Sequence, residues 1–464
     1  MSILLLVPPQ IQELNQQSAI ERAFHDALYP NLAYRAEAMA EEWPANTGQE
    51  VLQSRPSLLA PKTKALVPGT DPQPSTVVYE QWKVSLAQYA DAVDTHMPTA
   101  TTSNANLFLR NIQQLGLGAG QSINRIARNE LFKAYLSGQT ALTVATLTTD
   151  TQIQVASLNG FTDVIVPGTN VAPRPVSPSS PLSVTVGVAP TTAVVNVTGF
   201  VPNDPTDPFG PGVLLLSAAI GTAFAVRASV KSANAPRIVR SGGGATVDAI
   251  GPSDTLLLQD CINAVALLRR ANVMPHEDGY YHAHISPVAN AQIFADPAFQ
   301  RLNTALPEGT MYSSGFIGHI SGIMFFMNTE SPETANSGAT TATGPNFAQY
   351  SADIGAETVN DSGVAIGRTI VTGKGALYER YLDESQLVTE AGTVGKIGEF
   401  DVVNNGITIL TERIRLVIRA PFDRLQQVVG SAWSITTSFP IPSDITAQSG
   451  PERFKRAIVI ESSV

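Results

Sequence analysis

The chain has 464 residues, of which 43% are hydrophobic and only 15% are charged. This length exceeds one ordinary compact domain and predicts about two or three domains. The net charge of −10 argues against a protein whose main task is to grip nucleic acid. The single cysteine, Cys261, excludes an intrachain disulfide and is interpreted as a small buried side chain.

Residues 1–65 show no strong hydrophobic period, and a helical piece between 11 and 39 is interrupted by Pro30. Such a terminus is either disordered or an arm that packs on something else, and its aromatic content favours the arm. The apolar stretch 2–9 is too short for a signal sequence and lacks a basic leader. No apolar run approaches the roughly 18 residues of a membrane span. We therefore expect a soluble protein of cytoplasmic origin.

Large side chains occupy both alternating positions in residues 75–98. Tyr79 and Lys83 fall on one face, and Glu80 and Trp82 fall on the other. This pattern predicts an extended strand hairpin that is covered on both sides, with another subunit as one candidate for the cover.

Residues 102–140 are predicted to be helical. In the second half, Ile123, Ala127 and Leu131 lie on one stripe at helical spacing. Glycines at 116, 118 and 120 are expected to kink or break the first half.

The composition changes at residue 144, and the chain is rich in Thr, Val, Ala, Pro and Gly up to about residue 235. Short alternating segments separated by proline or glycine predict a β-rich inserted domain. Residues 212–230 fit either two strands with a turn or a helix. The run 241–245 (SGGGA) is predicted to be a flexible connector.

Residues 254–330 carry a regular succession of elements. Ser253 or Asp254 is placed to cap a helix, whose apolar stripe contains Leu257, Cys261, Val265 and Leu268. A strand in 278–287, a helical stretch in 288–302 interrupted by Pro297, and a strand pair in 315–330 follow.

The remaining third begins with a low-complexity loop at 331–346. Alternating segments predict strands around 413–419 and 433–439, and a last strand is expected at 454–463.

The order of elements in 254–329, and the strand motifs themselves, resemble the axial domain of tailed-bacteriophage major capsid proteins with the Hong Kong 97-type shell fold. The resemblance covers roughly residues 75–143 and 250–462. It implies an α+β fold with the following parts: an N-terminal arm (1–65), an extended loop (66–101), the spine helix of a peripheral domain (102–143), a β-rich insertion domain (144–240), an axial domain (241–375) and peripheral-domain C-terminal strands (376–464).

The resemblance also implies a structural protein that assembles into hexamers and pentamers, which form an icosahedral head around double-stranded DNA. The expected location is the virion. Expected partners are other copies of the chain, scaffolding and portal proteins, and decoration or cement proteins. Two alternatives stay open: a β-rich tail or adhesin component that binds a carbohydrate or protein receptor, and a hydrolase with dispersed catalytic groups. We expect no enzyme activity and assign no catalytic, cofactor-binding or metal-binding residue.

His282 and His284 form an H-x-H pair whose side chains would share one face of a strand, as zinc ligands do. A third ligand would come from His276, Glu277 or His319. Nothing in the spacing fixes that geometry, so packing or hydrogen-bonding histidines are favoured.

Two further patterns are interpreted without a ligand. Asn203, Asp204 and Asp207 offer oxygen atoms that suit calcium, but their spacing fits no EF-hand loop and favours a solvated turn. The GKG sequence at 373–375 lacks the flanking residues of a phosphate-binding loop and is interpreted as a turn.

The densest basic cluster consists of Arg413, Arg415, Arg419 and Arg424. It could face packaged DNA, but ion pairs between subunits are the favoured interpretation.

Overall fold

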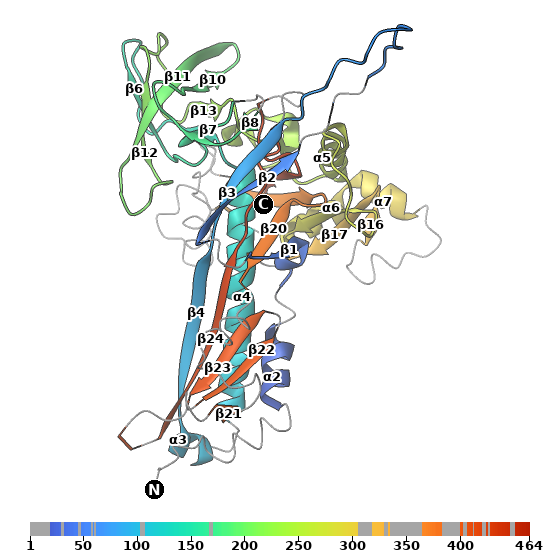
Figure 1. Cartoon of the computed structure of the whole chain (residues 1–464). Coiled ribbons are helices and arrows are strands. Elements are labelled where there is room, and N and C mark those ends of the chain that lie inside the picture. The colour runs from blue at the N-terminus through green and yellow to red at the C-terminus, as the bar shows by residue number, and fades with distance from the viewer. Residues whose placement is uncertain are drawn as a thin grey trace. The chain divides into compact units, whose positions relative to one another are not determined.

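The computed structural model (Figure 1) describes residues 19–28, 32–44, 48–56, 59, 62–102, 107–166, 170–304, 318–328, 333–334, 364–382, 400–401, 406–411, 413–419, 424–425, 427–445 and 451–464. The chain divides into two compact units. The first comprises Met1–Val51, Lys83–Arg128 and Leu377–Pro440, and the second comprises Leu52–Trp82, Asn129–Ala376 and Ile441–Val464. Helices and strands are mixed throughout, so the predicted α+β class is confirmed.

The first unit is built on a seven-stranded sheet in the order β1-β20-β24-β23-β22-β21, with β4 paired to β24. Its strands are β1 (Ala38–Glu42), β4 (Ala87–His96), β20 (Leu377–Tyr381), β21 (Phe400–Asp401), β22 (Gly406–Thr411), β23 (Ile414–Arg419) and β24 (Val428–Ser438). Its helices are α2 (Ala19–Leu28), η2 (Arg35–Glu37), α3 (Met97–Thr102) and the first part of α4 (Leu107–Tyr135).

The alternation predicted for the C-terminal strands is confirmed. Ile414, Leu416 and Ile418 of β23 are fully buried, as are Trp433 and Ile435 of β24. The strands therefore present one apolar face to the core of the first unit.

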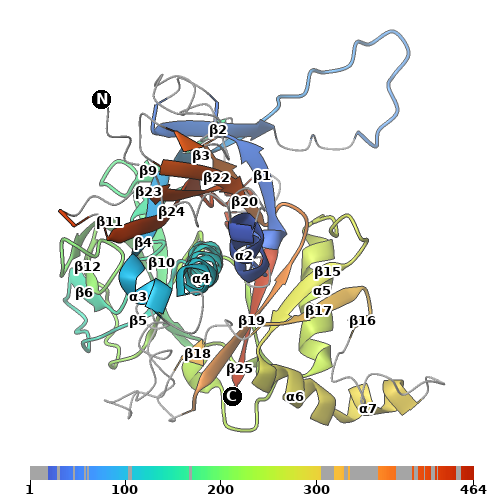
Figure 2. The same ribbon diagram turned by 90° about the horizontal axis from the view of Figure 1, so that it is seen from below.

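Helix α4 is continuous through Gly116, Gly118 and Gly120, so the prediction of a break there is wrong. A β-carbon at Gly116 would lie 2.7 Å from the carbonyl oxygen of Phe24, a residue of α2. Figure 2 shows α2 lying beside α4. Close approach of the two helices explains why this position has no side chain.

The second unit contains a seven-stranded sheet in the order β14-β25-β19-β15-β17-β16, with β18 paired to β19. These strands are β14 (Ile238–Arg240), β15 (Tyr281–Ile285), β16 (His319–Ile320), β17 (Ile323–Met327), β18 (Glu333–Thr334), β19 (Ile366–Thr372) and β25 (Ala457–Ser463). The helices of this part are η3 (Ser241–Gly243), η4 (Val247–Ala249), α5 (Leu258–Arg270), α6 (Pro287–Ala295) and α7 (Pro297–Thr304).

The predicted succession in 254–330 is confirmed as helix α5, strand β15, helices α6 and α7 separated at Pro297, and strands β16 and β17. Of the predicted apolar stripe, Cys261, Val265 and Leu268 pack into one core with β15, β17 and β25. Leu257 is wrong as a member of the stripe, because it precedes the helix and is 40% exposed, and Leu258 is buried in its place. The predicted cap is wrong. Asp254 accepts from the Gly251 amide at 2.8 Å, while the helix begins at Leu258 after Leu257, whose amide donates to Asp260.

The 241–245 segment is an ordered turn and not the flexible connector that its composition suggests. Ser241 is 1% exposed, and its hydroxyl donates to Asp260 at 2.8 Å. Gly242 has a φ of +76°, and a β-carbon there would meet the Asp254 carboxylate. Glycine is therefore needed for tight packing at this point.

The sequence predicted that the last strand would join the other C-terminal strands of 376–464. This prediction is wrong. β25 lies between β14, in parallel pairing, and β19, in antiparallel pairing. All seven residues of β25 are buried. A strand in the middle of a sheet that is covered on both faces gives no alternating pattern that would separate it from the rest.

The predicted β-rich insertion forms a six-stranded sheet in the order β5-β13-β10-β11-β12-β6. Its strands are β5 (Gln139–Ala141), β6 (Gln152–Val155), β10 (Leu182–Val188), β11 (Thr191–Pro202), β12 (Gly212–Leu216) and β13 (Ser229–Ser232), and a side sheet pairs β7 (Asp163–Val164) with β9 (Arg174–Pro175). Residues 212–230 thus form strands and not a helix.

The six-stranded sheet closes on itself. Leu142 bridges Val155, and the amides of Thr143 and Ala156 donate to Gln154 and Ala141, both at 3.0 Å. The two end strands are therefore hydrogen-bonded to each other, and the insertion is a small barrel without a free edge. Its interior is filled by its own apolar side chains, among them Leu182, Val184, Val186, Val197, Leu214 and Val230.

A third sheet in the order β2-β3-β8 joins β2 (Glu50–Pro56), β3 (Tyr79–Ser85) and β8 (Asn170–Val171). The predicted hairpin in 75–98 is wrong, because β3 pairs in this sheet whereas β4 pairs with β24. Only one face of β3 is buried, the one that carries Glu80, Trp82 and Val84.

Within the described residues, no helix is long and apolar enough to cross a membrane.

Candidate functional site

A long loop connects β2 to β3, and Figure 1 shows it as a blue trace running away from the two strands. Every residue from 62 to 76 is exposed. Leu59, Leu66 and Val67 are exposed by 51%, 59% and 65%. Leu52 on β2 and Tyr79 on β3 are also large exposed hydrophobic side chains. The loop thus offers apolar surface that nothing in its own unit covers.

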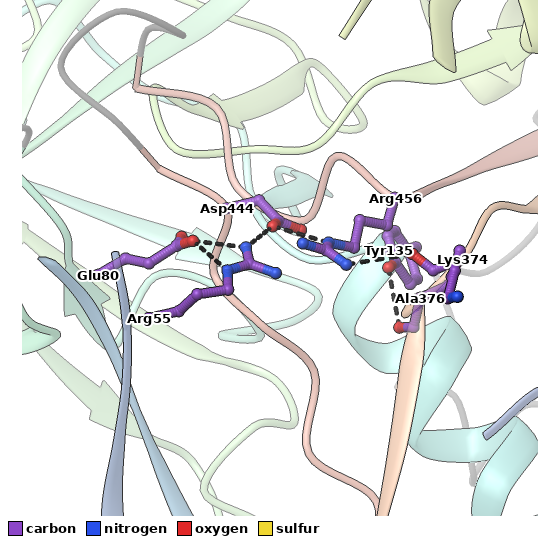
Figure 3. A network of polar contacts seen from close by, with 7 residues as sticks. All are labelled: Arg55, Glu80, Tyr135, Lys374, Ala376, Asp444 and Arg456. Atoms are coloured by element: carbon purple, nitrogen blue, oxygen red, sulfur yellow. Dashed lines mark hydrogen bonds and ion pairs between the residues drawn. The ribbon is translucent and has the colours of Figure 1, made fainter. Parts of the chain in front are cut away.

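A network of charged side chains lies at the base of this loop (Figure 3). Arg55 of β2 donates from Nε to Glu80 of β3 at 2.7 Å and also contacts Asp444. Arg456, just before β25, donates to the same Asp444 oxygen at 3.0 Å. The guanidinium of Arg55 also lies 5.9 Å from the ring centroid of Trp82. We call these four charged residues the loop-base network.

The loop-base network is largely buried, since Glu80 is 2% and Asp444 is 9% exposed. Burial raises the pKa of the Asp444 carboxyl to about 7. The negative charge of Glu80 raises this pKa further, whereas the positive charge of Arg55 opposes the rise. Burial lowers the pKa of Arg55, but Asp444 and Glu80 outweigh it and leave the pKa raised. The guanidinium therefore stays charged.

Arg456 extends the network toward the turn after β19. Its Nη1 donates to the carbonyl of Lys374 at 3.1 Å, and the hydroxyl of Tyr135 donates to the carbonyl of Ala376 at 3.0 Å (Figure 3). These contacts join β2, β3, residues 441–445, residues 451–456 and the end of α4 within one unit. The arrangement can fix the base of the loop.

His282 and His284 lie on β15 as predicted, and both rings contact Phe326, with centroids 5.0 and 5.5 Å away. His276 stacks on His282 almost in parallel, with ring centroids 4.0 Å apart. Nε2 of His282 faces Asp278 at 2.8 Å. Nε2 of His276 lies 3.2 Å from the Thr372 hydroxyl, so both stacked rings have hydrogen-bonding partners inside the unit. The contacts of His282 and His284 are therefore ring packing and hydrogen bonding, the roles that the sequence analysis favoured for these histidines.

The other two candidate ligands lie apart from this stack. Glu277 pairs with Lys374 at 3.3 Å, and the ring of His319 lies beside Tyr280. Burial raises the pKa of Asp278, but hydrogen bonds from the Tyr280 amide and His282 outweigh it and lower the pKa.

The members of the basic cluster have different surroundings. Arg413 donates to Glu379 at 2.9 Å and stacks over Tyr381, while Arg415 donates to the Ser434 hydroxyl at 3.2 Å. Arg424 is exposed. Arg413 thus forms an ion pair inside its own unit, and neither of the interpretations offered for the cluster accounts for it.

The remaining motifs form turns. Asp204 accepts from the amide and hydroxyl of Thr206, and these bonds lower its pKa. Residues 373–375 form the turn after β19, with Gly375 at a φ of +74°. Cys261 is fully buried, and burial raises the pKa of its thiol to about 12.

No family model and no curated protein matches the sequence. Among solved structures, the chain is similar to the capsid of Ralstonia phage GP4 (10% identity, TM-score 0.46), over 92% of this chain and 90% of that one. It is also similar to the capsid of cyanophage Pam1 (10% identity, TM-score 0.48), over 95% and 92% of the two chains. For the capsid of cyanophage P-SCSP1u, the values are 11% identity, TM-score 0.44, and 92% and 86%.

These similar structures are bacteriophage capsids, the class of protein that the sequence resemblance named. At these identities no residue role is transferred from them.

Sequence reasoning missed the loop-base network, whose members are spread from Arg55 to Arg456. One signal was available. Glu80 shares an alternating face with Trp82 and Val84, and an acid on an otherwise apolar face predicts a buried partner of opposite charge.

Proposed function

We propose that the chain is a major capsid protein, whose copies assemble as hexamers and pentamers into an icosahedral phage head around double-stranded DNA. Its role is structural and not catalytic. In this proposal α4 is the spine helix of a peripheral domain, and the sheet around β19 with α5 to α7 forms the axial domain. Scaffolding, portal and decoration proteins are the expected further partners.

The observation that carries the proposal is the exposed loop between β2 and β3. Leu59, Leu66 and Val67 are each more than half exposed. Large apolar side chains exposed together on one loop are the kind of surface that a binding partner covers. A second copy of the chain is the partner that a closed lattice supplies at every such loop.

The loop is also anchored at its base, as an element that bridges to a neighbouring copy needs to be. Its two strands are tied together by Arg55 and Glu80, and Asp444 ties them to residues 441–445. An element anchored at its base and exposed at its tip can reach a neighbouring copy. Many weak contacts of this kind, made at once, give a closed shell high stability.

The test combines negative-stain electron microscopy with light scattering on the purified full-length chain. We expect closed shells, rings of five or six subunits, or tubes. The Leu66→Asp/Val67→Asp variant should keep the circular dichroism and unfolding midpoint of the wild type but form no assemblies, because it places two charges in the contact.

The matched control is Thr63→Asp/Gln73→Asp, which adds the same charge at two exposed polar positions of the same loop. We expect it to assemble more than the Leu66/Val67 variant does. A wild-type chain that stays monomeric at high concentration, even with its phage partner proteins, would contradict the proposal. Equal assembly of both variants would contradict the role of the loop.

A further inference from the structure

Buried carboxylates in the described residues differ in how their two oxygens are used. Glu379, 2% exposed, receives Arg35 on Oε1 at 2.9 Å and Arg413 on Oε2 at 2.9 Å. Glu461, also 2% exposed, receives Arg368 on Oε1 at 3.3 Å and Arg240 on Oε2 at 2.8 Å. In both cases each oxygen has its own guanidinium.

The loop-base network is arranged differently. Glu80 uses only Oε1, which receives both contacts from Arg55. Asp444 uses only Oδ1, which receives Arg55 and Arg456. Glu80 Oε2 and Asp444 Oδ2 are buried without a hydrogen-bond partner among the described residues, and they are the only such carboxylate oxygens there. An unpaired buried oxygen on an anion is costly, and a proton bound there relieves that cost.

We propose that the loop base is a proton-dependent latch. Asp444, coupled to Glu80, binds one proton at its unpartnered oxygen, and this holds β2 and β3 against residues 441–445 and 451–456 most firmly below neutral pH. The inference depends only on contacts inside the second unit and does not rest on the proposed function.

The charged groups around Asp444 come from three segments. Arg55 approaches from β2 and Glu80 from β3, while Lys455 and Arg456 approach from the segment before β25. Lys455 also faces Glu452 and Arg237 electrostatically. Two carboxylates share Arg55, so the negative charge of Glu80 opposes ionisation of Asp444.

The direction of the effect follows from linkage. In the closed latch the pKa of Asp444 is about 7, whereas a solvated aspartate has a pKa of 3.8. Between these values the closed state binds a proton and an open state does not. Rising pH therefore favours opening, by at most about tenfold per pH unit for one proton. The change should level off above neutrality.

The experiment is hydrogen exchange by mass spectrometry on the full-length chain at about pH 5.5 and 7.5, corrected for intrinsic exchange rates. Peptides that contain residues 52–56 and 79–82 should lose at least about threefold in protection at the higher pH. Peptides from β25 around Glu461, whose oxygens are both paired, serve as the internal control and should not change.

The Asp444→Asn variant carries no titrating group at this position, so protection of the loop base should become independent of pH. The Glu80→Gln variant removes the opposing negative charge and should move the midpoint to lower pH. The control Asp248→Asn, at a carboxylate paired with Arg227, should behave as the wild type.

Equal protection at both pH values in the wild type, or an unchanged pH dependence in both Asp444→Asn and Glu80→Gln, would overturn the proposal. If Asp444→Asn does not fold, the shift in Glu80→Gln decides alone.

Discussion

The barrel and the loop between β2 and β3 lie in the same unit but differ in how far their apolar residues are buried. The barrel buries its own, with Leu182, Val184 and Leu214 at 0% exposure, and it pairs its two end strands. The loop leaves Leu66 and Val67 more than half exposed. A region that completes its own burial is stable by itself, whereas a region that does not depends on a partner. Substitutions in the two regions should therefore act on different properties.

The largest loss of stability is expected at the point where α4 leads into the barrel. Gly160 has a φ of +80°, and a β-carbon there would lie 2.2 Å from the backbone nitrogen of Gly138. Gly138 also donates from its amide to Asn159 at 2.8 Å. Because backbone cannot yield as a flexible side chain does, Gly160→Ala should cost more than about 4 kcal/mol of unfolding free energy.

Urea unfolding followed by circular dichroism measures this loss. Gly221→Ala is the matched control, because Gly221 has a similar φ of +74° but nothing within 4 Å of the added carbon. The control should cost only the backbone strain of about 1–2 kcal/mol. Equal losses at the two positions would show that the backbone contact is unimportant.

The next largest loss is expected inside the barrel. Leu214 is fully buried in the barrel core, so Leu214→Ala should cost about 2–5 kcal/mol by lost transfer energy and cavity formation. Leu215→Ala, at the neighbouring position on the other face of β12, should cost clearly less because Leu215 is only partly buried. Thermal or urea unfolding of both variants checks the difference, which would vanish if the barrel were not a packed core.

The sequence predicted those parts of the fold in which burial alternates or follows a helical stripe. The stripe on α5, apart from the exposed Leu257, and the alternation in β23 are confirmed because one face of each is buried. β25 was misplaced because all of its residues are buried, so its pattern does not indicate which sheet it joins. The loop-base network was missed because Arg55 and Asp444 are far apart in sequence and only the fold brings them together.

A smaller effect, counted per pH unit, is expected from the pH dependence of stability at the loop base. The pKa of Asp444 in the folded chain, about 7, lies above the unfolded value of 3.8. The folded state then holds a proton that the unfolded state has lost, so the stabilisation is complete below about pH 4 and is lost as the pH rises to about 7. The slope should not exceed about 1.4 kcal/mol per pH unit. Urea unfolding across this range should show a flatter profile for Asp444→Asn, and an identical slope would contradict the assignment.

The smallest effect on stability is expected in the loop itself. Leu66 and Val67 are 59% and 65% exposed, so Leu66→Ala/Val67→Ala removes side chains that are mostly in water already. The unfolding free energy should change by less than about 0.5 kcal/mol, as for other surface substitutions. The same variant should nevertheless raise the protein concentration needed for assembly, because truncated side chains bury less apolar area against a neighbour. Light scattering across a concentration series, with unfolding measured on the same samples, separates the two effects. A destabilised variant would show that the loop packs on its own unit, and the contrast with the barrel would then fail.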